Sequence, residues 1–192
     1  MKTLKLCLLA TMIITLAACK NDAKKQTIEE EVEKVVEEVT EEVKVISMAL
    51  ESKSGSSATG KIMFTEKDGE VTMEARISGL SPGTHAIHIH EQADCSAEDA
   101  SSSGGHWNPT FANHGAWGAE AGYHRGDIGN FEADDSGSGG ITFSTNEWCL
   151  GCDDDKKNII GKAIIVHQGA DDFTSQPSGA AGARVSCGGI IE

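Results

Sequence analysis

The chain has 192 residues, a formal net charge of −14 at pH 7 and six cysteines. This length suits one domain with attached segments. The acidic balance argues against nucleic acid as a partner and against adsorption to anionic lipid headgroups, because both require clustered lysine and arginine.

The first residues have the pattern of a bacterial secretion signal. Lys2 and Lys5 precede an apolar stretch, residues 6–16, that is too short to span a bilayer by itself. The stretch ends in Leu16-Ala17-Ala18-Cys19, which resembles the lipobox of bacterial lipoproteins, where the signal is cleaved before a lipidated cysteine. We expect a signal peptide over residues 1–19 and a lipid anchor on Cys19, which would hold the protein in the cell envelope, in the periplasm or at a membrane surface. Plain secretion with an incidental Cys19 is the alternative.

Residues 20–44 differ in composition from the rest of the chain. Glutamate dominates, and apolar residues recur at helical spacing from Ile28 to Val43. A short helical stalk would account for this spacing. We favour a solvated tether that its charges keep extended, because valine is a mediocre helix former and the segment is shorter than four heptads. A rival hypothesis makes this acidic segment the functional part, but it contains no recognisable motif.

Strand patterns prevail from Val45 onward, and residues 45–192 are expected to form one domain. Residues 62–66 and 71–78 flank Asp68-Gly69, a strong hairpin signal. Further short strands are expected at residues 127–133, 141–145, 159–167 and 185–191. Many short strands with glycine-rich turns, and no long helical pattern among them, predict an all-β antiparallel sandwich or barrel.

Six of the seven histidines and one aspartate form a pattern typical of metal sites. They are His88, His90, His106, His114, His124, Asp127 and His167. Imidazole suits copper and zinc, and a carboxylate is a normal additional ligand for zinc. The set is too large for one tetrahedral site and about right for two. Side chains alternate along a strand, so His85 should point away from its neighbours His88 and His90 and serve as a structural histidine bonded to backbone.

These residues lie in motifs whose order matches a known family. The motifs are His85-Ala86-Ile87-His88-Ile89-His90-Glu91, Gly105-His106-Trp107-Asn108-Pro109, His114-Gly115, His124-Arg125-Gly126-Asp127-Ile128-Gly129-Asn130, Ile160-Gly161-Lys162-Ala163-Ile164-Ile165-Val166-His167, Asp171-Asp172 and Gly182-Ala183-Arg184-Val185-Ser186-Cys187-Gly188. From Gly83 to Gly188 the chain resembles copper–zinc superoxide dismutases. The resemblance implies a Greek-key sandwich or barrel of immunoglobulin-like architecture with long metal-binding loops.

The resemblance also implies one copper and one zinc per chain, and superoxide as the substrate. Copper would take His88, His90, His106 and His167. Zinc would take His106, His114, His124 and Asp127. His106 would then bridge the two metals. The implied reaction is disproportionation of superoxide to oxygen and hydrogen peroxide, in which copper changes oxidation state and zinc does not.

Two further residues match family positions. Arg184 matches an arginine that attracts and orients the anion beside copper; a surface ion pair is the alternative. Asp171 matches an aspartate that hydrogen-bonds one copper histidine and one zinc histidine. A solvated loop acid is the other interpretation, which suits Asp172 better. Residues 168–183 contain no lysine, although many family members guide superoxide with lysines there, so we expect weaker electrostatic steering.

Four cysteines remain when those of the signal and the lipobox are set aside, and four cysteines allow three pairings. The resemblance implies a disulfide between Cys95 and Cys187, which leaves Cys149 and Cys152 for each other. A redox dithiol and half of a zinc site are the alternatives for Cys149 and Cys152, but the sequence has no second C-x-x-C motif.

The sequence leaves the oligomeric state undetermined, so a homodimer is open. The main rival to an enzyme is a metal-binding protein of the same fold that stores or delivers copper, or keeps zinc for structure. The complete set of four copper histidines together with Arg184 argues against this rival.

Overall fold

The computed structural model describes residues 43–192; the expected signal peptide, Cys19 and nearly all of the tether lie outside the described residues. The strands are β1 (Lys44–Ser52), β2 (Thr59–Lys67), β3 (Glu70–Ser78), β4 (Gly83–His90), β5 (Gly129–Ala133), β6 (Gly139–Thr145), β7 (Ala163–His167) and β8 (Arg184–Gly189). A short 3-10 helix, η1, spans Ser101–Ser103. Nowhere in residues 43–192 does a helix reach the length and apolar composition needed to cross a bilayer.

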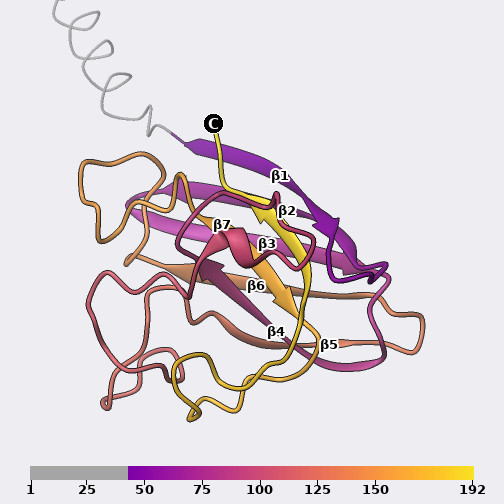
Figure 1. Ribbon diagram of the computed structural model, residues 1–192. Helices are drawn as coiled ribbons and strands as arrows, with labels where there is room; N and C mark the ends of the chain where they lie inside the picture. Colours follow the sequence, from indigo (N-terminus) through magenta and orange to yellow (C-terminus); the bar gives the residue numbers. More distant parts are fainter. Residues whose placement is uncertain (1–42) are drawn as a thin grey trace, which may run out of the picture. The chain divides into compact units, whose positions relative to one another are not determined.

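The strands close into one antiparallel barrel (Figure 1). Their order around the barrel is β1-β2-β3-β6-β5-β4-β7-β8. Because β4 and β6 exchange places relative to chain order, the connections cross over in the manner of a Greek key. The predicted all-β Greek-key fold is therefore confirmed.

The hairpin between β2 and β3 has the turn that its sequence predicts. Asp68 and Gly69 have φ values of 55° and 75°, and a two-residue type I′ turn requires positive φ at both positions. Along β3, buried residues alternate with more exposed ones, so one face of the strand lies on the core. This local agreement between turn and pattern sets the register of β2 against β3.

Two strands near the histidines are shorter than predicted. β5 begins at Gly129, because Asp127 and Ile128 form turns with backbone bonds to His124 and Gly126. β7 begins at Ala163, since residues 159–162 form a turn in which Lys162 N–H donates to Ile159 O. At both places the residues before the strand lie outside the hydrogen-bonded ladder of the barrel.

Candidate metal centre

The outer side of β4 and β7 is where the predicted ligands gather. Almost all residues of these strands are buried, so other parts of the chain cover the side that faces away from the core. His88 and His90 come from β4, and His167 ends β7. The strands pair with His88 opposite Ile165 and His90 opposite Ala163, which brings the three histidines to one surface.

Backbone hydrogen bonds dock the connection between β4 and β5 onto β4. Trp107 N–H donates to Ile89 O at 2.8 Å, Ile89 N–H donates to Gly126 O at 2.9 Å, and Gly126 N–H donates to Trp107 O at 3.0 Å. Gly126 must lack a side chain, because a Cβ there would overlap the carbonyl oxygen of Ile89. The docking holds the neighbouring His106 and Asp127 beside β4.

The structure brings the predicted ligands together in two buried clusters. Within each cluster, the candidate ligand atoms lie within 4.8 Å of one another. The first cluster contains His88, His90, His106 and His167. The second cluster contains His106, His114, His124 and Asp127. His106 belongs to both clusters, and its ring centroid lies 4.0 Å from that of His88.

The carboxylate of Asp127 is the centre of the second cluster. Its oxygens lie 2.8 Å from Nδ1 of His106, 3.0 Å from Nδ1 of His114 and 3.2 Å from Nδ1 of His124. Despite these distances, Nδ1 of His114 and Nδ1 of His124 make no hydrogen bond. Ligands of a tetrahedral zinc ion, each about 2.0–2.1 Å from the metal, lie about 3.3 Å from one another. Three nitrogens and one carboxylate at this spacing fit zinc.

Each histidine of the first cluster keeps one buried nitrogen without a hydrogen-bond partner. These atoms are Nδ1 of His88, Nε2 of His90, Nε2 of His106 and Nε2 of His167. A buried polar atom left unpaired costs about 1–3 kcal/mol. A cation bound among them would pair all four nitrogens, and an all-imidazole set suits copper.

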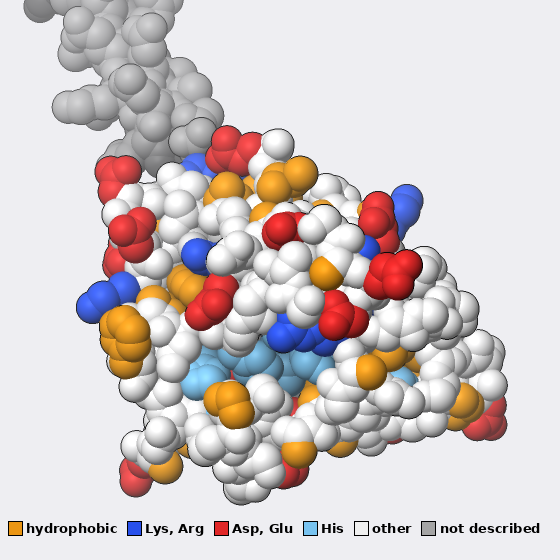
Figure 2. Space-filling view, in the orientation of Figure 1, with side chains coloured by type: hydrophobic (Ala, Val, Ile, Leu, Met, Phe, Trp, Pro, Cys, Tyr) orange, Lys and Arg blue, Asp and Glu red, His pale blue; other side chains and the backbone are white. Residues whose placement is uncertain are grey.

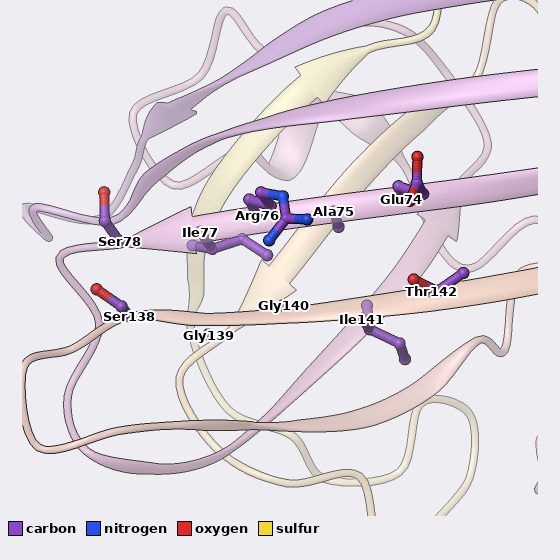
Figure 3. A pocket seen from close by; sticks show the side chains of 10 residues that line it. All are labelled: Glu74, Ala75, Arg76, Ile77, Ser78, Ser138, Gly139, Gly140, Ile141 and Thr142. Atoms are coloured by element: carbon purple, nitrogen blue, oxygen red, sulfur yellow. The ribbon is translucent and has the colours of Figure 1, made fainter.

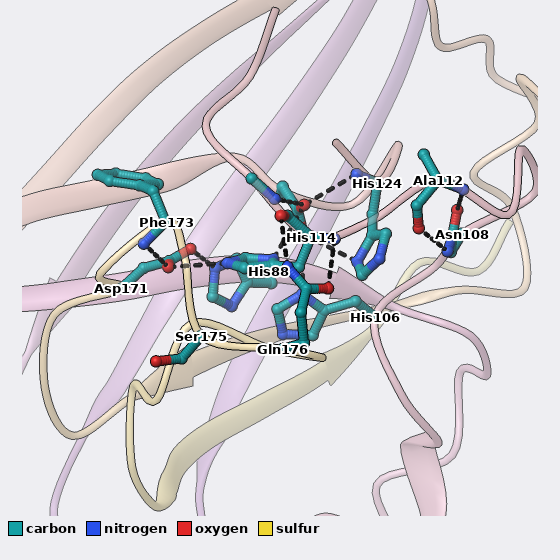
Figure 4. Close-up of polar contacts among 12 residues, drawn as sticks. His88, His106, Asn108, Ala112, His114, His124, Asp171, Phe173, Ser175 and Gln176 are labelled. Atoms are coloured by element: carbon teal, nitrogen blue, oxygen red, sulfur yellow. Dashed lines mark hydrogen bonds and ion pairs between the residues drawn. The ribbon is translucent and has the colours of Figure 1, made fainter. Parts of the chain in front are cut away.

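Asp171 links the two clusters, because its carboxylate contacts one histidine ring from each of them (Figure 4). One carboxylate oxygen lies 2.9 Å from Nε2 of His88, and the other lies 2.9 Å from Nε2 of His114. Asn130 on β5 holds the backbone of Asp171: its Nδ2 donates to Asp171 O at 2.9 Å, and its Oδ1 accepts from Asp171 N–H at 2.8 Å. Asn130 was not among the predicted site residues, although it ends one of the matching motifs.

Backbone carbonyls fix two more rings. His90 Nδ1 lies 3.0 Å from Gly104 O, and His167 Nδ1 lies 3.3 Å from Gly182 O. A ring that donates from one nitrogen presents the lone pair of the other to a metal. His85 differs, since its two nitrogens each lie 2.8 Å from a backbone carbonyl oxygen and it belongs to neither cluster, which matches the structural role expected for it.

Burial favours the neutral form of three of the clustered histidines. Burial, aided by neighbouring histidines, lowers the pKa of His106 to about 4 and that of His167 to about 3, and it holds the pKa of His90 well below its usual value. Burial alone would raise the pKa of Asp127, but hydrogen bonds from the His106 ring and from the backbone N–H of His124 outweigh it and leave that pKa below its usual range. Neutral imidazole and ionised carboxylate are the forms that bind metals.

A pocket of about 450 Å³ opens onto the first cluster, and Arg184 is part of its lining together with His90, His106 and His167. Figure 2 shows histidine side chains on the floor of a recess, with a basic side chain directly beside them. Among the lysines and arginines of residues 43–192, Arg184 alone lines this pocket. A small anion in the pocket would therefore meet both the first cluster and a guanidinium.

The guanidinium of Arg184 is held by the segment around η1. Nη1 donates to Ala100 O at 2.7 Å and to Ser103 Oγ at 3.0 Å, and Nη2 donates to Gly104 O at 2.8 Å. Burial lowers the pKa of Arg184, and the nearby Asp99 opposes this effect. Because these bonds fix the planar group, it keeps a defined orientation toward the pocket.

Both disulfides are present. The bond between Cys95 and Cys187, whose Cα atoms lie 5.8 Å apart, ties the connection that holds Arg184 to the strand that carries Arg184. The bond between Cys149 and Cys152 closes a small loop before β7. Because these two sulfurs are bonded to each other, neither is a free thiolate that could bind zinc.

A hollow of about 630 Å³ lies away from the clusters, over β3 and β6 (Figure 3). Gly139 and Gly140 line it beside Glu74 and Arg76. The residues lining this hollow include no histidine or cysteine, so it offers neither an imidazole nor a thiolate to a metal.

Solved structures of other proteins share this fold. Among solved structures, a superoxide dismutase-like protein from Bacillus subtilis is 31% identical, with a TM-score of 0.68 over 76% of this chain and 97% of that chain. A double mutant of that protein, in which histidine replaces one tyrosine and one proline, is 33% identical with the same TM-score and coverage. The clock protein EA4 is 33% identical, with a TM-score of 0.65 over 80% of this chain and 97% of that chain.

The sequence family described as copper/zinc superoxide dismutase matches residues 58–190. This match begins just before β2 and ends just after β8, so it includes both clusters, Asp171, Arg184 and both disulfides. Because it spans well over half of the sequence, the chain belongs to the copper/zinc superoxide dismutase family.

Proposed function

We propose that this protein converts superoxide to oxygen and hydrogen peroxide, with copper held by the first cluster and zinc by the second. The observation that carries the proposal is the set of four unpartnered imidazole nitrogens beneath a pocket that contains a fixed guanidinium. Copper bound there would supply one-electron oxidation and reduction, and zinc would supply a fixed charge and structural order.

Arg184 attracts and orients the substrate in this proposal. Superoxide is a small anion, and the guanidinium presents a positive charge whose position three hydrogen bonds fix. A preorganised donor of this kind needs no reorganisation when the anion arrives. The proposed role of Arg184 is therefore to raise the concentration of superoxide in the pocket and to set its approach.

His106 handles a proton in this proposal. It lines the pocket, and its Nε2, one of the four nitrogens that would hold copper, has no hydrogen-bond partner in the protein. Whenever copper does not occupy this atom, it would be able to take up a proton and to return it to a reduced oxygen species. Forming hydrogen peroxide from two superoxide anions consumes two protons, so a proton-exchanging group in the pocket serves the reaction. Nδ1 of the same ring lies against Asp127, which keeps the ring in place.

The test is superoxide disproportionation by the purified chain loaded with copper and zinc, with metal content counted on the same sample. We expect one copper and one zinc per chain and fast turnover. His167→Ala removes one nitrogen of the first cluster only, so it should abolish turnover and copper retention while zinc stays bound. Full metal loading without turnover would contradict the proposal.

A second candidate function is metal binding without turnover. The relatives from Bacillus subtilis are described only as superoxide dismutase-like, which makes a non-catalytic member of the fold a real alternative. Both functions require the histidine set of the first cluster, but Arg184 in the adjoining pocket is suited to binding an anion, which storage or delivery of copper does not require. The loading experiment separates the two functions.

We further propose that the protein works in the cell envelope, anchored to a membrane through lipid on Cys19. The Leu16-Ala17-Ala18-Cys19 motif supports the anchor, and two disulfides suit an oxidising compartment. Several acyl chains would anchor stably, since each buried CH₂ contributes about 0.8 kcal/mol. Mass spectrometry of the mature N-terminus tests this, and Cys19→Ala should release the protein from membranes. An unmodified Cys19 in the mature protein would contradict it.

A further inference from the structure

The side chain of Gln176 makes two hydrogen bonds to the backbone of His114, a predicted zinc ligand. Its Oε1 accepts a hydrogen bond from His114 N–H at 2.9 Å, and its Nε2 donates to His114 O at 2.9 Å. Figure 4 draws Gln176 next to His114. One side chain thus satisfies both polar groups of one residue, as a neighbouring strand would do in a sheet.

His114 needs such support more than the ligands of the first cluster do. His88, His90 and His167 stand on paired strands, whose ladders fix their backbones. His114 lies outside the named strands, in the connection between β4 and β5. Its buried ring must nevertheless meet Asp127 at Nδ1 and Asp171 at Nε2, at 3.0 Å and 2.9 Å.

The segment that carries Gln176 also carries Asp171 and part of the pocket wall. Asp171 contacts the ring of His114, and Gln176 contacts its peptide groups, so one connection holds this ligand at two points. Pro177 and Ser178, which follow Gln176 directly, line the pocket. The same contact therefore fastens the second cluster to the rim of the pocket.

We propose that Gln176 is a positioning residue: by holding the peptide groups of His114 it retains zinc in the second cluster and fixes the adjacent pocket rim. This inference rests on the proposed function, because it takes zinc to be the cation of the second cluster. Groups that orient metal ligands through hydrogen bonds typically change metal affinity by about 10–100-fold when they are lost.

The test compares three variants of the full chain loaded with copper and zinc. Gln176→Met keeps the length of the side chain and removes both hydrogen bonds. Gln176→Glu keeps the acceptor for His114 N–H and loses the donor to His114 O. Gln168→Met is the matched control, because Gln168 lies in the same connection and none of the hydrogen bonds among the described residues involves its side chain.

Zinc release to a chromogenic chelator is followed for each variant. We expect release to be about 10–100-fold faster for Gln176→Met, intermediate for Gln176→Glu and unchanged for Gln168→Met. Cobalt in place of zinc gives a second readout, since a displaced ligand shifts its visible absorption bands. Copper release should change less than zinc release, because the first cluster retains its strand-borne ligands.

The proposal is overturned if Gln176→Met holds zinc as long as the unsubstituted chain does and gives the same cobalt spectrum. It is equally overturned if Gln168→Met releases zinc as fast as Gln176→Met, because the effect would then be a general loosening of the connection. An unsubstituted chain that takes up no zinc would overturn the proposed function as well, which distinguishes that failure from a failure of Gln176 alone.

Discussion

Gly179 lies so close to the carboxylate of Asp171 that a Cβ on Gly179 would overlap Oδ1. The same Cβ would come within 2.7 Å of Nε2 of His114, the atom that Asp171 holds. Gly179 has a φ of 68°, so an L side chain would also strain the backbone. The contact between Asp171 and His114 therefore depends on a missing side chain.

We expect Gly179→Ala to displace Asp171 and to weaken zinc binding about 10–100-fold, with a loss of about 1–3 kcal/mol in the free energy of unfolding. Zinc competition titration and urea unfolding measure the two effects. Gly161→Ala is the control, because Gly161 has a φ of 83° and nothing within 4 Å of its added Cβ. Equal losses of zinc affinity in both variants would contradict the prediction.

Arg184→Lys should lower kcat/KM for superoxide by about 10-fold while both metals stay bound. Lysine keeps the charge, but it cannot make the bonds to Ala100, Ser103 and Gly104 with one planar group. Stopped-flow or pulse-radiolysis rates give the measurement. Arg76→Lys, on the outer surface of β3, serves as the control and should leave the rate unchanged. Equal rates for both variants would mean that the charge alone suffices.

The reaction rate should depend weakly on ionic strength. Glu91 also lines the pocket, so it offsets the charge of Arg184, and no lysine is part of this lining. Steering of a charged substrate falls steeply with salt only where like charges are clustered. Ser178→Lys, which adds a cation to the lining, should raise the rate at low salt and make it salt-sensitive. A steep decline for the unsubstituted chain would refute the expectation.

Removing the two disulfides should have unequal effects. Cys95 and Cys187 are 92 residues apart, whereas Cys149 and Cys152 are three apart. In the chain-entropy model the long loop contributes about 4–5 kcal/mol to the free energy of unfolding and the short one about 2 kcal/mol. Unfolding of the two double-alanine variants in urea checks this order, and the first should also lower turnover, because that bond secures the surroundings of Arg184. A larger effect from the Cys149 and Cys152 pair would contradict the model.

The metal-free protein should lose stability as the pH falls from about 6.5 toward 4. In the unfolded chain histidine takes up a proton near pH 6.5, whereas burial holds the pKa of His106 at about 4 and that of His167 at about 3 in the fold. The unfolded state therefore binds more protons in this window, which favours unfolding by about 1.4 kcal/mol per pH unit for each histidine. Urea unfolding between pH 7.5 and 4.5 measures this, and a flat profile would be evidence against it.

Much of the fold could be predicted because local signals agree with the long-range arrangement. Asp68-Gly69 forms the turn its residues favour, and the alternation along β3 matches its one buried face. The predicted starts of β5 and β7 were wrong, because these strands begin at Gly129 and Ala163. Turns precede both strands, and no periodicity in an apolar pattern reports such a turn.

The two clusters could be anticipated because their residues are chemically distinctive, and the structure brings them together. Asn130, Gln176 and Ser103 could not be anticipated, because an amide or hydroxyl gives no sign in the sequence of which distant backbone group it will meet. Gln176 bonds to a residue 62 positions away, across two connections without regular structure. Such contacts depend on loop packing, which emerges only in the folded chain.

Because His106 belongs to both clusters, two cations bound there would not bind independently of each other. A cation on one nitrogen of an imidazole makes the proton on the other nitrogen easier to remove, and removing that proton is what the second cation requires. By thermodynamic linkage, each cation changes the affinity for the other by the same factor, whichever arrives first. At equilibrium, the final metal content then does not depend on the order in which the two metals are delivered. Where that factor favours joint binding, a cell that supplies both metals will hold few chains with only one metal.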